Sequence, residues 1–259
     1  MQLINFEIDK HIATITLNHP EKRNCLAMPM IEEILQAFDT CENQHVRVIV
    51  LRTLPGSTVW SSGHDVQEIP LDKQDPVTWN VPYVTSLRRV RNMLIPVIAE
   101  IEGTVWGGAC DLVMSCDMII ATENVTFAIT PAKLGIPYNT AGVSHFLGAL
   151  PTHVVKEMFL TAQPLPVEKA HRYGLVNYLV PADQLESQAR QVAERIASMA
   201  PLCIRVIKAE LAKLMDSISI SADDFEHIQM LRREAFRSDD FQEGMNAFRE
   251  KRHPQFHGK

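Results

Sequence analysis

The chain has 259 residues, of which 46% are hydrophobic and 22% are charged. This length suits one large domain, or a domain with a small helical extension, and the composition excludes a wholly disordered chain. A formal net charge of −6 gives no reason to expect nucleic-acid binding. The five cysteines are scattered, without a CxxC pair or a Cys/His cluster, so neither a disulfide framework nor a structural zinc site is indicated.

The first residues alternate charged and hydrophobic side chains and lack the hydrophobic region of a signal peptide. No hydrophobic run reaches the roughly 20 residues that a membrane-spanning helix needs. We therefore expect a cytoplasmic protein without a membrane partner.

The first half of the chain alternates strands, turns and helices. Hydrophobic periodicity predicts strands at 3–8, 12–17, 46–51, 96–101, 118–121 and 126–129. Within residues 59–66, a short strand is expected to lead into a glycine turn. Helices are predicted at 29–41, 85–93 and 109–116, a turn at 103–108, and a mobile loop at 72–81. This alternation predicts an α/β fold with buried strands.

After about Thr140 the pattern becomes helical. Helices are predicted at 153–161, 167–173, 182–199, 202–215, 222–236 and 245–251. The chain is therefore divided into an α/β core, residues 1–195, and a helical C-terminal region, residues 196–259.

Two glycine-containing segments are candidates for a binding site. Gly63 in SSGHDV, and Gly107 with Gly108 in WGGACDLVMSCD, allow sharp turns that point backbone N–H groups into a cavity. Two such donors aimed at one oxygen form an oxyanion hole, in which the loss of one donor costs about 2.7–4 kcal/mol of barrier. The alternative is two ordinary turns of an α/β protein.

The two glycine-containing segments form a pattern with two others, TPAKLGIPYNTAG (residues 130–142) and EGMNAFREKRHPQF (residues 243–256). Together the four segments resemble the crotonase (enoyl-CoA hydratase/isomerase) superfamily. The resemblance covers most of residues 3–142 and the end of the chain. It implies a crotonase-like spiral of ββα units, followed by a helical region that mediates assembly into a homotrimer or a dimer of trimers.

The resemblance also implies an acyl-CoA thioester as the substrate. The backbone N–H groups of His64 and Gly108 are expected to bind its carbonyl oxygen. Lys251 is expected to approach the CoA phosphates or the pantetheine arm, with Phe248 nearby. Further expected substrate contacts are Ser62, Gly63, Asp65, Val66, Thr130 and Tyr138.

Hydratases of this superfamily carry a glutamate at the two positions that correspond to Asp111 and Ala132. Hydration needs acid/base groups placed on water and on the substrate α-carbon, and an alanine cannot supply one. Asp111 has two interpretations: a group that assists near the reacting carbon, or an acid in a first helical turn, where the helix dipole favours it.

Tyr138, in GIPYNTAG, resembles the tyrosine of superfamily members that decarboxylate methylmalonyl-CoA or malonyl-CoA without biotin. A neutral tyrosine can hold the departing carboxylate perpendicular to the thioester plane, while the oxyanion hole stabilises the thioenolate. A glutamate at position 132 would repel this carboxylate. The alternative for Tyr138 is a loop tyrosine packed against the core.

The resemblance therefore implies an acyl-CoA decarboxylase that forms propionyl-CoA or acetyl-CoA and CO2. It would use no cofactor and no metal, since coenzyme A is part of the substrate. The expected catalytic residues are His64, Gly108, Tyr138 and Asp111. Two alternatives stay open: an enoyl-CoA hydratase or isomerase with displaced carboxylates, and a non-catalytic protein that binds acyl-CoA or RNA.

Overall fold

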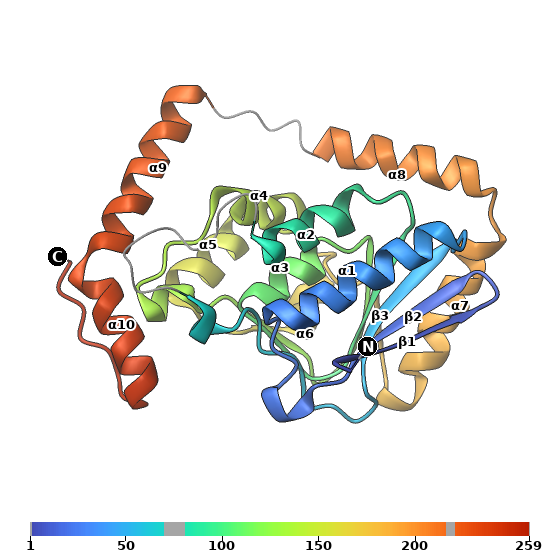
Figure 1. Ribbon diagram of the computed structural model, residues 1–259, viewed down its shortest axis with the longest axis horizontal. Helices are drawn as coiled ribbons and strands as arrows, with labels where there is room; N and C mark the ends of the chain where they lie inside the picture. The colour runs from blue at the N-terminus through green and yellow to red at the C-terminus, as the bar shows by residue number, and fades with distance from the viewer. Residues whose placement is uncertain (1, 70–80, 216–220, 259) are drawn as a thin grey trace.

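A computed structural model describes residues 2–69, 81–215 and 221–258. Two sheets form the centre of the molecule, and helices cover them on several sides (Figure 1). The mobile loop predicted at 72–81 lies outside the described residues, apart from residue 81.

The larger sheet is mostly parallel. Its strands, in spatial order, are β1 (Ile4–Asp9), β2 (Ile12–Leu17), β3 (Val48–Thr53), β5 (Val97–Ile101), β7 (Met118–Thr122) and β10 (Tyr178–Val180). Only the β1–β2 pair is antiparallel. Every residue of β5 is buried, as expected for a parallel strand with both faces covered.

The smaller sheet contains the strands that lead to the candidate site. Its order is β4 (Val59–Ser61), β6 (Thr104–Trp106), β8 (Thr126–Ala128) and β9 (Leu165–Pro166). The first three are parallel, and β9 is antiparallel to β8. From β3 to β8 the strands alternate between the two sheets, and a helix follows each pair, which gives the expected ββα spiral.

Helices pack on both faces of the larger sheet. One hydrophobic core joins α1 (Met28–Asn43) and α2 (Pro82–Asn92) to the strands. On the other face, α7 (Leu185–Ser198) buries Leu185, Ala189 and Val192 against side chains of β2, β3, β5 and β7. The remaining helices of the first 175 residues are α3 (Gly108–Met114), α4 (Thr140–Ala149), α5 (Thr152–Thr161) and α6 (Val167–Arg172).

In the described part of the C-terminal region, three helices follow α7: α8 (Pro201–Met215), α9 (Ala222–Arg237) and α10 (Asp239–Glu250). Buried Lys208 anchors α8, because its Nζ lies 2.6 Å from Asp117 Oδ2 and donates to the carbonyl oxygens of Val90 and Ile95. Phe236 of α9 packs with Phe241 and Met245 of α10 in a separate small core. In Figure 1, α9 and α10 lie at one end of the molecule, and α8 lies along its upper side.

The prediction of strands and helices was wrong at several places. Residues 104–106 are strand β6, not part of a turn, because they pair with both β4 and β8. Helix α4 and the short strands β9 and β10 were not predicted. Residues 182–184 form a 3-10 turn ahead of α7.

Candidate active site

The parallel strands β4, β6 and β8 bring three predicted segments together. The carboxyl ends of parallel strands lie at one edge of a sheet, where ligand sites commonly form. Residues 62–64 follow β4, Gly107 and Gly108 follow β6, and Thr130 follows β8. A Cβ atom on Gly63, whose φ is +87°, would lie 2.7 Å from the Gly108 nitrogen. The two predicted donor segments are thus in direct backbone contact, which a side chain at position 63 would prevent.

A small chamber of about 100 Å³ lies at this edge. None of the described residues that line it is an aspartate or a glutamate. Its lining residues are Ser62, His64, Val66, Ile69, Tyr83, Gly107, Gly108, Thr130, Pro131, Leu134, Ile136, Pro137, Tyr138 and Asn139.

A wider cavity of about 580 Å³ adjoins the chamber and shares Ser62, His64, Val66, Thr130 and Leu134 with it. Three cationic residues, which the sequence analysis missed, line this outer cavity: Lys22, Arg23 and Lys133. Phe248 and Asp65 line it too. The Asp65 carboxylate accepts the backbone N–H of Gln67 at 2.9 Å and so caps a 3-10 turn.

Tyr138 packs against the hydrophobic core and also lines the chamber. Its ring packs edge-on against Phe146 and Phe159, with ring centroids 6.2 and 5.1 Å away. It also lines the chamber, and its hydroxyl donates to Asp111 Oδ2 at 3.3 Å. Burial, together with the nearby Asp111 carboxylate, raises the pKa of Tyr138 well above its ordinary value. The hydroxyl therefore keeps its proton at neutral pH.

Asp111 lies behind Tyr138 and is not among the residues that line the chamber. It occupies the first turn of α3, as one interpretation expected, but it is completely buried. Its Oδ1 lies 2.6 Å from His145 Nδ1. The sequence analysis missed His145, which is 34 residues away on the helix α4 that was not predicted.

Two further side chains lie beside the donor segments. The Tyr83 hydroxyl donates to the Gly108 carbonyl at 2.9 Å, and burial raises the pKa of Tyr83 well above its usual range. The His64 ring lies 5.2 Å from the Tyr83 ring, and burial lowers the pKa of His64. Within the described part of the chain, the buried His64 Nδ1 has no hydrogen-bond partner. His64 is thus a neutral imidazole with free hydrogen-bonding capacity.

Four positions singled out in the sequence line neither cavity: Gly63, Asp111, Ala132 and Lys251. Lys251 is an exposed residue at the C-terminal end of α10, so its predicted contact with coenzyme A stays a prediction. Ala132 is exposed in the 3-10 turn after Thr130.

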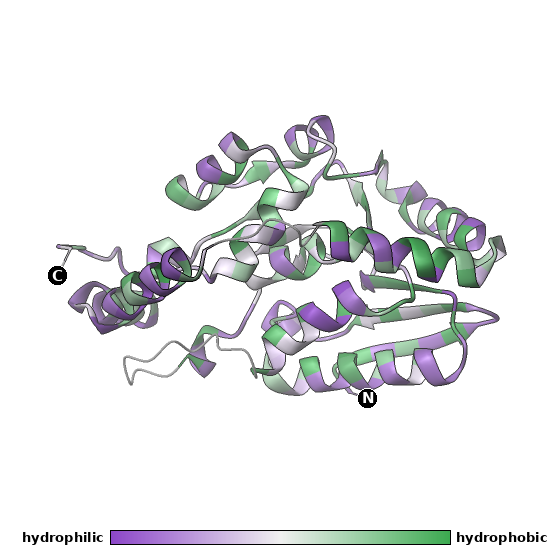
Figure 2. Ribbon diagram, turned by 90° about the horizontal axis from the view of Figure 1, so that it is seen from above, coloured by the Kyte–Doolittle hydropathy of each residue, from purple (hydrophilic) through white to green (hydrophobic). Residues whose placement is uncertain are grey.

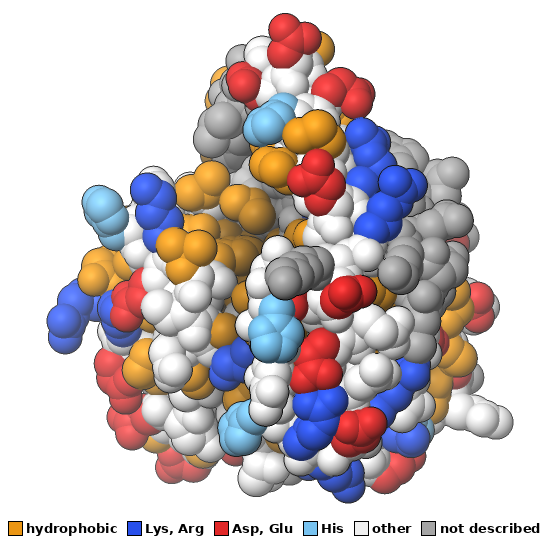
Figure 3. Space-filling model, turned by 90° about the vertical axis from the view of Figure 1, so that its left-hand side faces the viewer, with side chains coloured by type: hydrophobic (Ala, Val, Ile, Leu, Met, Phe, Trp, Pro, Cys, Tyr) orange, Lys and Arg blue, Asp and Glu red, His pale blue; other side chains and the backbone are white. Residues whose placement is uncertain are grey.

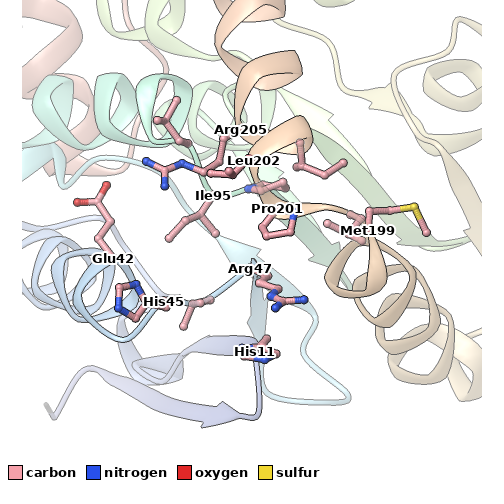
Figure 4. A pocket seen from close by; sticks show the side chains of 14 residues that line it. His11, Glu42, His45, Arg47, Ile95, Met199, Pro201, Leu202 and Arg205 are labelled. Carbon is pink, nitrogen blue, oxygen red and sulfur yellow. The ribbon is translucent and has the colours of Figure 1, made fainter.

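A separate cavity of about 490 Å³ lies where α7 gives way to α8 (Figure 4). Glu42 and His45 line it from the end of α1, and Leu202 and Arg205 line it from α8. It shares no lining residue with the two cavities described above and includes none of the predicted site residues.

The family model described as enoyl-CoA hydratase/isomerase matches residues 7–259. The chain belongs to this family. The predicted family and fold class are therefore confirmed. In residues 2–69, 81–215 and 221–258, no three His, Cys, Asp or Glu side chains are grouped to hold a metal ion, and no helix is long and hydrophobic enough to cross a membrane.

Similar members of the enoyl-CoA hydratase/isomerase family include a decarboxylase. The chain is 39% identical over 257 residues to methylmalonyl-CoA decarboxylase of Escherichia coli, covering 99% of this chain and 98% of that protein. A solved structure of methylmalonyl-CoA decarboxylase in complex with 2-nitronate-propionyl-CoA matches with a TM-score of 0.97 and 39% identity, covering 100% and 99% of the two chains. The mitochondrial enoyl-CoA hydratase domain-containing protein 3 of Rattus norvegicus is 30% identical, covering 94% of this chain and 80% of that protein.

Proposed function

We propose that the protein decarboxylates methylmalonyl-CoA, or malonyl-CoA, to propionyl-CoA, or acetyl-CoA, and CO2. The observation that carries this proposal is the composition of the chamber. It joins two glycine-turn donor segments to a tyrosine hydroxyl, and no carboxylate lines it among the described residues. Such a chamber accepts a substrate that brings its own carboxylate, and its small volume suits a short acyl group.

The thioester carbonyl binds to the backbone N–H groups of His64 and Gly108. The contact of Gly63 with the Gly108 nitrogen supports this pairing, because it holds the two segments together. Both donors are fixed before the substrate arrives, so they stabilise the developing enolate oxygen without reorganisation. Ser62, Val66 and Thr130 line the boundary between the two cavities and contact the acyl end of the thioester.

Tyr138 donates a hydrogen bond to the substrate carboxylate and holds it perpendicular to the thioester plane. In this position the breaking C–C bond overlaps the carbonyl π-system, so its electron pair passes into the thioenolate while CO2 leaves. The thioester carbonyl of the substrate accepts the electron pair of the breaking bond. We therefore propose a reaction without biotin or a metal ion. The raised pKa of Tyr138 supports its role as a donor, because the hydroxyl stays protonated.

The outer cavity binds the coenzyme A part of the substrate. Lys22, Arg23 and Lys133 supply positive charge for its phosphates, and Phe248 supplies an aromatic surface. Lys251, near the same end of α10 as Phe248, remains a candidate for a further phosphate contact.

We also propose that residues 196–259 mediate assembly into a homotrimer or a dimer of trimers. Helix α8 exposes Leu202, Val206 and Leu211, which are 70%, 56% and 55% exposed. Figure 2 looks onto the side on which α8 lies and shows hydrophobic residues along that helix. Figure 3 shows hydrophobic side chains gathered beside the upper part of α9, where Phe225 and Leu231 are exposed. A second copy that covered these residues would remove hydrophobic surface from water. The cytoplasmic location stays a prediction.

A mass-spectrometric screen of the purified full-length protein tests the function. Methylmalonyl-CoA, malonyl-CoA and crotonyl-CoA are incubated separately, and the acyl-CoA products are identified. We expect loss of CO2 from the first two and no addition of water to the third. Rapid hydration of crotonyl-CoA without CO2 release would identify a hydratase instead. Binding of all three thioesters without turnover would identify a non-catalytic acyl-CoA-binding protein.

A further inference from the structure

A buried row of three side chains runs from the chamber into the protein. Tyr138 lines the chamber, Asp111 lies behind it, and His145 of α4 lies beyond Asp111. The contacts are 3.3 Å from the Tyr138 hydroxyl to Asp111 Oδ2 and 2.6 Å from Asp111 Oδ1 to His145 Nδ1. Asp111 and His145 do not line the chamber, so any action on the substrate must pass through Tyr138.

The position of one proton decides what Tyr138 can do. A tyrosine hydroxyl has a single proton, which can point to Asp111 or into the chamber, but not to both at once. When Asp111 Oδ2 carries a proton, Asp111 becomes the donor of this contact. The Tyr138 proton is then free to face the substrate, while Asp111 Oδ1 accepts the N–H of His145.

The absence of a side chain at Gly142 leaves room for the contact between Tyr138 and Asp111. A Cβ atom there would lie 2.3 Å from Tyr138 Cε1 and 2.8 Å from Asp111 Oδ2. A glycine inside a helix is less favourable than an alanine, so its presence in α4 fits a need for close packing. The tyrosine and the carboxyl group are thereby held against the helix that carries His145.

We propose that Asp111 and His145 are positioning residues that supply the proton by which the thioenolate becomes product. This inference rests on the proposed decarboxylation. After the C–C bond breaks and CO2 leaves, the α-carbon takes the hydroxyl proton of Tyr138, and the Tyr138 oxygen takes the proton of Asp111. One proton from solvent, taken up through His145, then returns Asp111 to its protonated form. One proton is consumed for each CO2 released, so the reaction is balanced.

The row offers a proton route that the substrate does not block. A bound acyl-CoA fills the chamber and the outer cavity, which closes the front of Tyr138 to water. Asp111 has no exposed surface, whereas the His145 side chain is 10% exposed. His145 is therefore the member of the row at which a proton can enter from solvent.

Other titratable groups surround Asp111 and bear on any pH dependence. Tyr83 of α2 and Cys110 of α3 lie close by, in addition to Tyr138 and to His145 of α4. Burial raises the pKa values of Tyr83 and Cys110, so both keep their protons near neutral pH. His145 and Asp111 are the other titratable members of this group, and they are in direct contact.

Exchange of the α-protons of propionyl-CoA in D2O tests the proton step alone, since it forms the same thioenolate without CO2. We expect the wild-type protein to catalyse exchange. D111N keeps a donor toward Tyr138 but has no proton to transfer, and H145N keeps a donor toward Asp111 but cannot take up a proton. Each should slow exchange by roughly 10²-fold, the lower end of what acid/base groups contribute. Both should retain a first-turnover burst of CO2 from methylmalonyl-CoA, followed by slower turnover.

The matched control is H153N, because His153 is an exposed histidine at the start of α5. H153N should catalyse exchange of the α-protons of propionyl-CoA at the wild-type rate. Wild-type exchange measured in mixtures of H2O and D2O gives a readout that does not depend on the folding of any variant. A bowed dependence on the deuterium fraction is expected for two protons in motion, from Tyr138 and from Asp111.

Exchange at the wild-type rate in D111N and H145N, or a linear dependence for the wild type, would overturn the inference. Decarboxylation by a wild-type protein that does not exchange the α-protons would overturn it as well. Absence of CO2 release from the wild type would instead reject the proposed function, so the two failures are distinguishable.

Discussion

At the scale of single residues, the site depends on groups that position other groups. The two donor segments touch through Gly63, and Tyr138 is held by aromatic rings on one side and by Asp111 on the other. The sequence predicted Gly63, Gly108 and Tyr138 as site residues because their local motifs are distinctive. It did not predict His145 or Tyr83, since each reaches the site from a distant part of the chain.

Removal of the Tyr138 hydroxyl tests its proposed contact with the substrate carboxylate. A hydrogen bond to a charged group contributes about 1.5–3 kcal/mol, so Y138F should lower kcat for decarboxylation by about tenfold to a hundredfold. The affinity for coenzyme A should not change, because Tyr138 does not line the outer cavity. Steady-state kinetics with methylmalonyl-CoA measures kcat, and inhibition of that reaction by free coenzyme A measures the affinity for coenzyme A. Y173F is the matched control, since Tyr173 is a half-exposed tyrosine outside the site. Full activity of Y138F would reject the role.

The close packing at Gly142 gives a second prediction. In G142A, the new methyl group would overlap the Tyr138 ring, so decarboxylation should fall by at least about tenfold as the ring moves. The control is G148A in the same helix, where the glycine is exposed. That variant should retain activity. Equal activity of the two variants would show that the Tyr138 position is not critical.

At the scale of elements, the main strands and most helices were predicted from periodicity. Helix α4 was missed because Gly142 and Gly148 interrupt its pattern, although Asn139 caps it by accepting the Gly142 N–H at 2.6 Å. Strands β9 and β10 have only two and three residues, too few for a period to be visible. Strand β6 was taken for a turn because it lies between Gly103 and Gly107, and only its pairing with β4 and β8 identifies it.

Strand β5 carries a buried carboxyl group that should make stability depend on pH. Burial raises the pKa of Glu100 from 4.5 to about 7, although Arg52 lies 4.0 Å away. Between these two pH values the folded chain binds more protons than the unfolded chain, so the free energy of unfolding falls as the pH rises. Over this pH range the free energy of unfolding falls by roughly 3 kcal/mol in total, at about 1.4 kcal/mol per pKa unit.

The variant E100Q should remove this dependence. It should unfold at a higher temperature than the wild type at pH 8 and show little difference at pH 4.5, and thermal unfolding across this pH range measures the effect. Arg52 retains Glu186 at 2.7 Å, so its charge stays paired. E123Q serves as the control because Glu123 is exposed, and it should leave the pH dependence unchanged. A wild-type stability that rises from pH 5 to pH 7 would contradict the account.

At the scale of the whole molecule, the family and the fold class followed from the resemblance of several short motifs, taken together, to one superfamily. The cationic lining of the outer cavity could not be predicted, since Lys22 and Arg23 lie far along the chain from Lys133. The division into residues 1–195 and 196–259 remains a prediction.

Assembly gives a prediction at the same scale. The wild-type protein should have three or six times the 29.2 kDa mass of one chain in light-scattering measurements after gel filtration. L211D places a charge among the exposed hydrophobic residues of α8 and should shift the mass toward one chain. K213D, on the same helix at an exposed polar position, should leave it unchanged. A wild-type mass of one chain would contradict the assembly.

The central claim is loss of the substrate carboxylate through a thioenolate, without biotin or a metal ion. Methylmalonyl-CoA labelled with ¹³C in its free carboxylate tests it directly, with avidin and a metal chelator present. We predict that labelled CO2 and propionyl-CoA appear in equal amounts and at the same rate with and without these additives. Absence of labelled CO2, together with rapid hydration of crotonyl-CoA by the same preparation, would contradict the account.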